Sequence, residues 1–272
     1  MANPKPSQHS TPPAGSLEGL PQADSYADHP RRRELLTKVE GMLRRYYPSE
    51  EDPYRLYEAE ISKHLTPESV LLDAGCGRTA PTLTMFAKRV SRAIGVDLVD
   101  FSQELEGGGL TLLQNGLESI PLPDATVDVI ISRSVMEHLE EPLQVYREFE
   151  RLLRPGGKVV FITPNRWSYP IVAARMIPNR FHALLVSFAE GRPREDTFPT
   201  YHRSNSFRAI RRLARDARLE VAGLRYLATF PNYLMFHPLA FRAGVGIERL
   251  FRNVKALNGL QHWILAVLSK PR

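Results

Sequence analysis

Short apolar runs alternate with helical stretches from about residue 66 onward. The runs that have the length and composition of buried strands are 70–74 (VLLDA), 93–98 (AIGVDL), a run beginning at 110–113, 127–132 (VDVIIS) and 158–163 (KVVFIT). Residues 219–229 and 262–269 (HWILAVLS) also have strand character. Continuous apolar strands that alternate with helices are typical of a parallel sheet covered on both faces. The pattern therefore predicts an α/β fold with helices on both faces of the sheet.

The helical segments are recognised by apolar residues that recur every three to four positions. The clearest is 142–153 (PLQVYREFERLL), and the run Arg-Pro-Gly-Gly at 154–157 is expected to end it. Further helices are expected at 31–45, 54–65, 82–89, 206–217 and within 233–255. In an open α/β sheet the ligand lies at the carboxyl ends of the strands, so functional residues are expected directly after each strand.

The segments outside this pattern predict the layout of the domains. Residues 1–30 are rich in Pro, Ser and Gly and predict a disordered tail. They lack the apolar core and basic end that a signal peptide would have. Residues 31–65 are expected to form a helical cap. Residues 66–272 are expected to form the main domain, with lid insertions at about 165–205 and 233–258. We find no apolar run of about 18 residues, which predicts a cytoplasmic protein without a membrane-spanning helix.

Composition and charge add two constraints. Cys76 is the single cysteine among 272 residues, so an intramolecular disulfide is excluded and no cysteine cluster for a metal is expected. The net charge of +6 divides into −7 over residues 1–157 and +13 over residues 158–272. A basic second half favours an anionic partner, such as a membrane surface, a nucleic acid or a phosphorylated substrate. The alternative is that these arginines only make the exposed faces of helices polar and well hydrated.

The sharpest chemical signal is the turn Asp73-Ala74-Gly75-Cys76-Gly77, directly after a buried strand. Together with Ala80 it satisfies G-x-G-x-x-A, so a dinucleotide site has to be considered. Asp97 ends the next strand, where a carboxylate can accept both ribose hydroxyls of an adenosine. Asp73 would face the anionic pyrophosphate of NAD unfavourably. S-adenosylmethionine (SAM) has no phosphate and carries a sulfonium and an ammonium group, so the turn favours SAM over NAD.

With these segments in order, the chain resembles the class I SAM-dependent methyltransferases, in the compact-motif branch known as type 11. VLLDAGCG is similar to the first motif of that family and IGVDL to the second. NGLESIPLPDATVDVIISRSVMEHLEEP and RLLRPGGKVVFITPN are similar to the later segments. The resemblance covers about residues 66–165. It implies SAM as cofactor and a Rossmann-like, seven-stranded, mostly parallel sheet with an antiparallel C-terminal strand.

The resemblance also implies roles for individual residues in binding SAM. At the methionine end these are Asp73, Ala74, Gly75 and Gly77; at the ribose and adenine they are Asp97, Leu98, Gly116, Leu117 and Glu118; near the sulfonium they are Ser132 and Arg133. Glu137 and His138 would lie at the mouth of the site. The family often has an acid at the position of Gly116, which would bond the adenine amino group. Asn115 or backbone groups are therefore expected to substitute for it.

The acceptor of the methyl group is expected to be small or linked to a lipid or glycan, with transfer most readily to oxygen. The candidate general bases are His138, His202 and Tyr201, in that order. The stretch GRPREDTFPTYHRSN resembles segments of bacterial methyltransferases near surface-polysaccharide or lipid-linked pathways. After the fourth strand, Ser-Arg-Ser at 132–134 stands where enzymes that methylate amino groups of DNA bases or glutamine have a tetrapeptide such as Asn-Pro-Pro-Tyr, which argues against a nucleic-acid substrate.

Two further hypotheses remain open from the sequence. A non-catalytic SAM-binding sensor or scaffold could use the basic second half to bind an anionic partner. Separately, residues 236–251 mix bulky apolar residues with nearby arginines, as a helix that lies at an anionic membrane surface would. The alternative for this segment is a helix packed on the edge of the sheet.

Overall fold

The computed structural model describes residues 41–42, 45–47, 52–102, 109–169, 171–172, 198–231, 234 and 237–272. The strands are β1 (Val70–Ala74), β2 (Arg92–Asp97), β3 (Thr111–Gln114), β4 (Val127–Arg133), β5 (Leu153–Pro164), β6 (Glu220–Leu227) and β7 (Trp263–Ser269). The helices are α2 (Pro53–Ser62), α3 (Pro81–Ala87), α4 (Pro142–Leu152), α7 (Phe207–Asp216), α8 (Pro238–Asn253) and the 3-10 helix η5 (Lys255–Leu260). The expected tail, most of the helix expected at 31–45 and the middle of the first expected lid lie outside the described residues.

The described strands form one seven-stranded sheet in the order β3-β2-β1-β4-β5-β7-β6. Strands β1 to β5 pair in parallel, and β7 is antiparallel to both of its neighbours, β5 and β6. This arrangement confirms the expected Rossmann-like sheet, mostly parallel with an antiparallel C-terminal strand. Ala74 pairs with Val96 and Asp97 pairs with Gln114. The residues that follow β1, β2, β3 and β4 therefore gather at one edge of the sheet.

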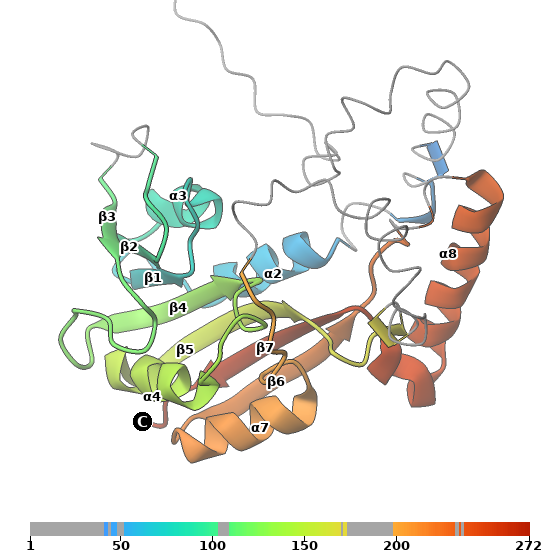
Figure 1. Cartoon of the computed structure of the whole chain (residues 1–272). Helices are drawn as coiled ribbons and strands as arrows, with labels where there is room; N and C mark the ends of the chain where they lie inside the picture. The colour runs from blue at the N-terminus through green and yellow to red at the C-terminus, as the bar shows by residue number, and fades with distance from the viewer. Residues whose placement is uncertain are drawn as a thin grey trace, which may run out of the picture.

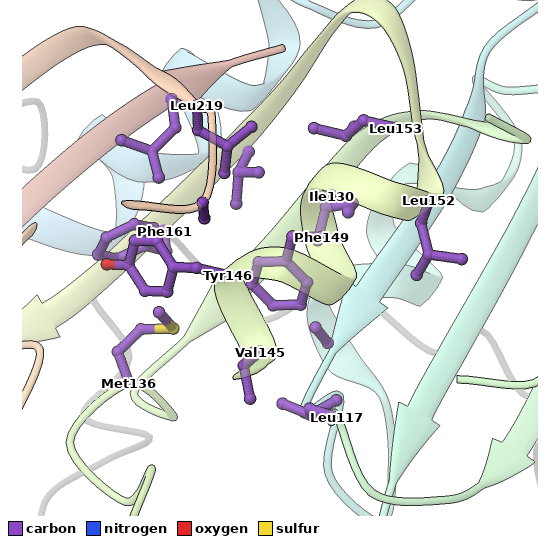
Figure 2. Close-up of a cluster of buried hydrophobic side chains, with 14 of the residues drawn as sticks. Leu117, Ile130, Met136, Val145, Tyr146, Phe149, Leu152, Leu153, Phe161 and Leu219 are labelled. Atoms are coloured by element: carbon purple, nitrogen blue, oxygen red, sulfur yellow. The ribbon is translucent and has the colours of Figure 1, made fainter. Parts of the chain in front are cut away.

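Helices cover both faces of the sheet, as expected. Helices α4 and α7 lie on one face, and α2 and α3 lie on the other (Figure 1). Figure 2 shows the hydrophobic core between the sheet and helices α4 and α7, in which Tyr146 and Phe149 of α4 pack with Phe161 of β5. All three side chains are fully buried. Apolar side chains on both faces of the central strands explain why their sequences read as continuous apolar runs.

Two local features position the chain around the site. Helix α2 begins where the Asp52 carboxylate accepts hydrogen bonds from the N–H groups of Tyr54 and Arg55, at 2.9 and 3.1 Å. Strand β5 begins directly after α4, five residues before the strand that the sequence predicts. The reason is that Leu153 already pairs with Val127, ahead of an irregularity in the pairing of β4 with β5.

Helix α8 contributes no buried side chain to the two cores that cover the faces of the sheet. Its buried residues Phe241 and Val245 form a small separate core with Met42, Tyr46, Tyr47 and Phe230. Among the helices that the structure describes, none is both long enough and apolar enough to cross a membrane.

Candidate active site

The turn after β1 passes close to the end of β2. Gly75 and Gly77 have φ angles of 80° and 73°, in the left-handed region that glycine adopts without a steric penalty. The Gly75 N–H donates to the carbonyl oxygen of Val96 at 2.8 Å. A Cβ added at Gly75 would lie 2.3 Å from Cγ2 of Val135, whereas one added at Gly77 would meet no atom within 4 Å. Packing therefore requires glycine at 75, and Gly77 faces open space.

Asp97, at the end of β2, ties this turn to the loop that follows it. Its Oδ2 accepts from the Gly77 N–H at 2.7 Å, and its Oδ1 accepts from the N–H groups of Leu98 and Val99 at 2.7 and 3.2 Å. A carboxylate has about four acceptor sites, so these amides leave room for a ligand hydroxyl. Leu98 beside it is 62% exposed. The carboxylate thus lies against the glycine turn with an exposed apolar side chain next to it.

The loop after β3 shows what replaces the missing acid at position 116. The Asn115 side-chain amide donates to the carbonyl oxygens of Gly116 and Ser119, at 2.7 and 2.6 Å. It therefore holds the shape of the loop. A Cβ at Gly116 would lie 2.7 Å from Oε2 of Glu118. The Glu118 carboxylate thus occupies the space that a side chain at 116 would fill, while Leu117 turns into the core (Figure 2).

The buried carboxyl group of Asp73, in β1, lies near the guanidinium group of Arg133, at the end of β4. Asp73 is 2% exposed. Burial is the largest cause that raises its pKa, to about 7, and the charge of Asp97 raises it further, while Arg133 and the Leu83 N–H oppose the shift. The Arg133 guanidinium lies over the ring of Tyr54, 5.2 Å from its centroid. A buried carboxyl group beside a guanidinium group can pair with the ammonium group and the carboxylate group of an amino acid, respectively.

Tyr57 is a member of this cluster that the sequence did not reveal. It comes from α2 and is fully buried, and its hydroxyl has no well-aligned hydrogen-bond partner among the described residues, although the Ser132 backbone lies near enough to lower its pKa. Burial raises the pKa of this phenol well above its usual value, and the charge of Asp73 adds to the effect. A buried polar atom without a partner is costly unless a ligand or water satisfies it. The spacing of Tyr57 and Ile61 within α2 indicates only a core-facing position.

The Ser132 hydroxyl makes a hydrogen bond that supports the turn. Its side chain is fully buried, and its hydroxyl donates to the carbonyl oxygen of Ala74 at 2.8 Å. This bond joins the ends of β4 and β1 where the turn begins. Cys76 is buried as well, and burial raises the pKa of its thiol. The thiol is therefore neutral at physiological pH, as expected for a small buried residue in the turn.

The three candidate bases meet at the neighbouring part of the same edge. Nδ1 of His138 lies 2.9 Å from the carbonyl oxygen of Pro199. The carbonyl oxygen of Glu137 accepts hydrogen bonds from the N–H groups of Tyr201 and His202, at 2.8 and 3.1 Å. The Tyr201 hydroxyl donates to Glu140 at 3.3 Å, on the exposed side of the loop. The loop after β4 and the segment around residue 200 thus form one unit.

Glu137 anchors that unit through a buried chain of polar groups. The residue is 5% exposed, and Oε2 accepts a hydrogen bond from the Thr163 hydroxyl at 2.9 Å. The Asn205 amide donates to the same hydroxyl at 2.6 Å. Oε1 of Glu137 lies 4.0 Å from Nε2 of His138. The residue pair Glu-His was visible in the sequence, but its link to Thr163 and Asn205 depends on long-range contacts.

The described side chains favour an organic cofactor at this edge. Within the part of the chain that the structure describes, no three His, Cys, Asp or Glu side chains are placed to hold a metal ion. SAM fits the groups that are present: open space at Gly77, a buried acid beside a base, an unsatisfied phenol, and a carboxylate next to an exposed apolar residue. Strand order reverses between β1 and β4, the position where sheets of this kind bind their ligands.

Comparison with known proteins places the chain in a family. Residues 72–161 match the type 11 methyltransferase domain. The chain is 31% identical to a ubiquinone biosynthesis O-methyltransferase of Methylococcus capsulatus, over 68% of this chain and 77% of that protein. It is 33% identical to a Mycolicibacterium smegmatis protein named "Probable S-adenosylmethionine-dependent methyltransferase", over 48% of this chain and 55% of that one. The chain belongs to the class I SAM-dependent methyltransferases.

The match to the Mycolicibacterium protein spans only about half of its length, as does the match to a tRNA U34 carboxymethyltransferase of Saccharophagus degradans, which covers 56% of that protein at 27% identity. Among solved structures, a geranyl diphosphate C-methyltransferase of Streptomyces coelicolor has the same fold, with a TM-score of 0.53 and 18% identity over 89% of this chain and 83% of that one. The chain thus belongs to a family named for its use of SAM, and the names of its relatives give different acceptors.

Proposed function

We propose that this methyltransferase transfers the methyl group of SAM to an oxygen atom of a small acceptor or of one linked to a lipid or glycan. The observation that carries the donor half is the convergence of Asp73, Asp97 and Arg133 at the carboxyl ends of adjacent parallel strands. The acceptor half rests on His138 and Glu137 after β4, on the same edge.

Each part of SAM has a counterpart among the described residues. Asp73 would hold the ammonium group and Arg133 the carboxylate, with Ala74, Gly75 and Gly77 as the backbone cradle. Asp97 would accept from the ribose. The exposed Leu98 would flank the adenine, the backbone of Gly116 and Leu117 would approach its edge, and Glu118 would accept from its amino group in place of the absent acid. The geometry at Gly116 supports this last assignment over Asn115, whose amide is used within the loop.

The protein's contribution to the reaction is alignment and removal of a proton. Bound SAM supplies a methyl group on a cationic sulfur, and the neutral thioether that remains is a good leaving group. Holding two reactants in line can account for roughly 7–11 kcal/mol of a barrier. The polar chain from Glu137 through Thr163 to Asn205 fixes the loop after β4, so it fixes His138 beside the space that an acceptor would enter.

His138 is suited to take the proton of a hydroxyl acceptor. When Nδ1 donates to the Pro199 carbonyl, Nε2 keeps its lone pair and can act as a base. Glu137 then stabilises the charged ring, because its Oε1 is 4.0 Å from Nε2. The Tyr201 hydroxyl is directed to Glu140 instead, and His202 contributes its backbone N–H. The order His138, His202, Tyr201 therefore stands as our proposal.

Replacing His138 by alanine is expected to lower kcat for a hydroxyl acceptor by about 10²–10⁴-fold and to leave SAM affinity unchanged. Tyr201→Phe is the matched control and should retain most of the activity. Turnover is measured as formation of S-adenosylhomocysteine with a panel of phenolic, carboxylic and lipid-extract acceptors. Full activity of His138→Ala on a hydroxyl acceptor would rule out the residue as the base.

Calorimetric titration with SAM and S-adenosylhomocysteine tests the cofactor site itself. We expect micromolar binding of both by the wild type and loss of binding in Asp97→Ala. Asp100→Ala, three residues further on and exposed, should bind normally. A folded wild type that binds neither compound would contradict the proposal, and NAD would be tested next. SAM binding without turnover on any acceptor would favour the non-catalytic sensor instead.

A lipid-linked acceptor also suggests where the enzyme works. We propose that it meets its acceptor at an anionic membrane surface. The excess of positive charge over residues 158–272 supports this, since basic surfaces are attracted to anionic lipid headgroups.

A further inference from the structure

Helix α8 exposes an apolar stripe on the side turned away from its own core. Nine large apolar side chains are exposed among the described residues, and four of them belong to α8 and the residue that follows it. They are Leu239, Ile247, Leu250 and Val254, with exposed fractions of 67%, 41%, 51% and 39%. Their spacing places them along one side of the helix. Such a concentration on one element marks an interaction surface.

Folding does not account for the stripe. The helix buries the opposite side, with Phe241 and Val245 packed against Tyr46 and Phe230. These contacts fix the helix to the rest of the chain. Within the part of the chain that the structure describes, the stripe is left exposed and can contact something outside the molecule.

The charges of α8 indicate the chemistry of that partner. Arg242 and Arg249 are exposed and flank the stripe, and Arg249 lies over the Tyr46 ring at 5.1 Å from its centroid. Glu248 is the one acid in α8, and it is 1% exposed and accepts a hydrogen bond from the Tyr169 hydroxyl at 2.7 Å. The outward side of the helix thus combines apolar residues with positive charge alone. This combination fits the boundary between headgroups and acyl chains of an anionic bilayer.

The position of α8 connects this surface to the active site. Directly after β5, Asn165 donates to the carbonyl oxygens of Gly259 and Gln261, at 2.7 and 2.9 Å. Tyr169, four residues further on, bonds α8 as described above. Figure 1 shows α8 beside the sheet, on the side toward which the arrows of β4 and β5 point. A bilayer in contact with α8 would therefore lie near the edge where the acceptor enters.

We propose that α8 docks the enzyme on an anionic bilayer through the stripe Leu239, Ile247, Leu250 and Val254. This inference deepens the proposed function, since it assigns the surface through which a lipid-linked acceptor is reached. The apolar residues insert at the headgroup boundary, and Arg242 and Arg249 bind the anionic headgroups.

Flotation of the full chain with lipid vesicles tests the proposal. Vesicles of equal parts phosphatidylglycerol and phosphatidylcholine should carry the protein, and vesicles of phosphatidylcholine alone should not. The double variant Ile247→Asn/Leu250→Asn is expected to weaken binding at least about tenfold. Met85→Asn on α3, with a similar exposed fraction of 53%, is the matched control and should bind as the wild type does. Arg242→Glu/Arg249→Glu should also lose binding, whereas Arg212→Glu on α7 should keep it.

Three outcomes overturn the proposal. A wild type that stays at the bottom with both vesicles has no such surface, and equal flotation of the Ile247/Leu250 variant moves the contact elsewhere. A dimer in light scattering that this variant abolishes, without flotation, would show that a second copy covers the stripe. SAM binding is measured on the same samples. Flotation without SAM binding would defeat the proposed function and leave the docking surface standing, whereas SAM binding without flotation would do the reverse.

Discussion

Alanine at position 75 is expected to destabilise the protein by about 2–4 kcal/mol and to abolish SAM binding. Two effects add. An alanine at the observed φ of 80° is strained by about 1–3 kcal/mol, and its Cβ would lie 2.3 Å from Cγ2 of Val135, closer than side chains approach. Val135 has to move, and with it the loop that carries Glu137 and His138. Thermal unfolding and SAM calorimetry measure the two losses.

The variant Gly77→Ala distinguishes the effect of lost packing from the effect of lost space for the ligand. The φ of 73° imposes similar backbone strain, but the new Cβ meets no atom within 4 Å. We therefore expect a smaller loss of stability together with a loss of SAM binding, because the open space is the one assigned to the cofactor. Adding Val135→Ala to Gly75→Ala should restore part of the stability. A Gly75→Ala protein that melts with the wild type and binds SAM would contradict this account of the turn.

The sheet could be predicted from the sequence because its signals are local. Each central strand is a continuous apolar run, the glycine turn lies directly after one of them, and Asp97 ends another. Boundaries were less accurate where pairing decided them, as at Leu153, which enters β5 because Val127 lies opposite. The requirement for glycine at 75 was readable as a glycine in the turn, but the side chain that imposes it through packing, Val135, is 60 residues away.

The residues of the candidate site could be predicted from the sequence, but the contacts between them could not. Asp73, Asp97 and Arg133 lie at the carboxyl ends of strands and could be named. Tyr57 could not, since its helical spacing is that of any core residue. The place of Glu118 over Gly116 depends on the shape of one loop, and the bond between His138 and Pro199 joins residues 61 positions apart. Such non-local contacts carry no sequence signal of their own.

Asp73→Asn is expected to make the SAM-free protein more stable above pH 7 while weakening its affinity for SAM about 10–100-fold. The sign follows from the pKa, which rises from 3.8 in the unfolded chain to about 7 in the folded protein. A raised carboxyl pKa contributes stability that is complete below pH 3.8 and is lost as the pH rises through 7. Asparagine has no charge to bury, so its advantage should grow over that interval to roughly 2–4 kcal/mol at pH 8.

The loss of affinity has a different cause from the gain in stability. The ammonium group of SAM favours the charged form of Asp73, so binding near pH 7 should release part of a proton from the wild type. Calorimetry in buffers of different ionisation enthalpy detects that release, and Asp73→Asn should show none. Arg133 and Asp97 also act on this carboxyl, and neither is altered in the variant. Tyr57→Phe removes a hydroxyl without a described partner, so it should cost little stability and yet weaken SAM binding. Equal SAM affinity in Asp73→Asn, with the same buffer dependence as the wild type, would show that the buried acid serves the fold and not the cofactor.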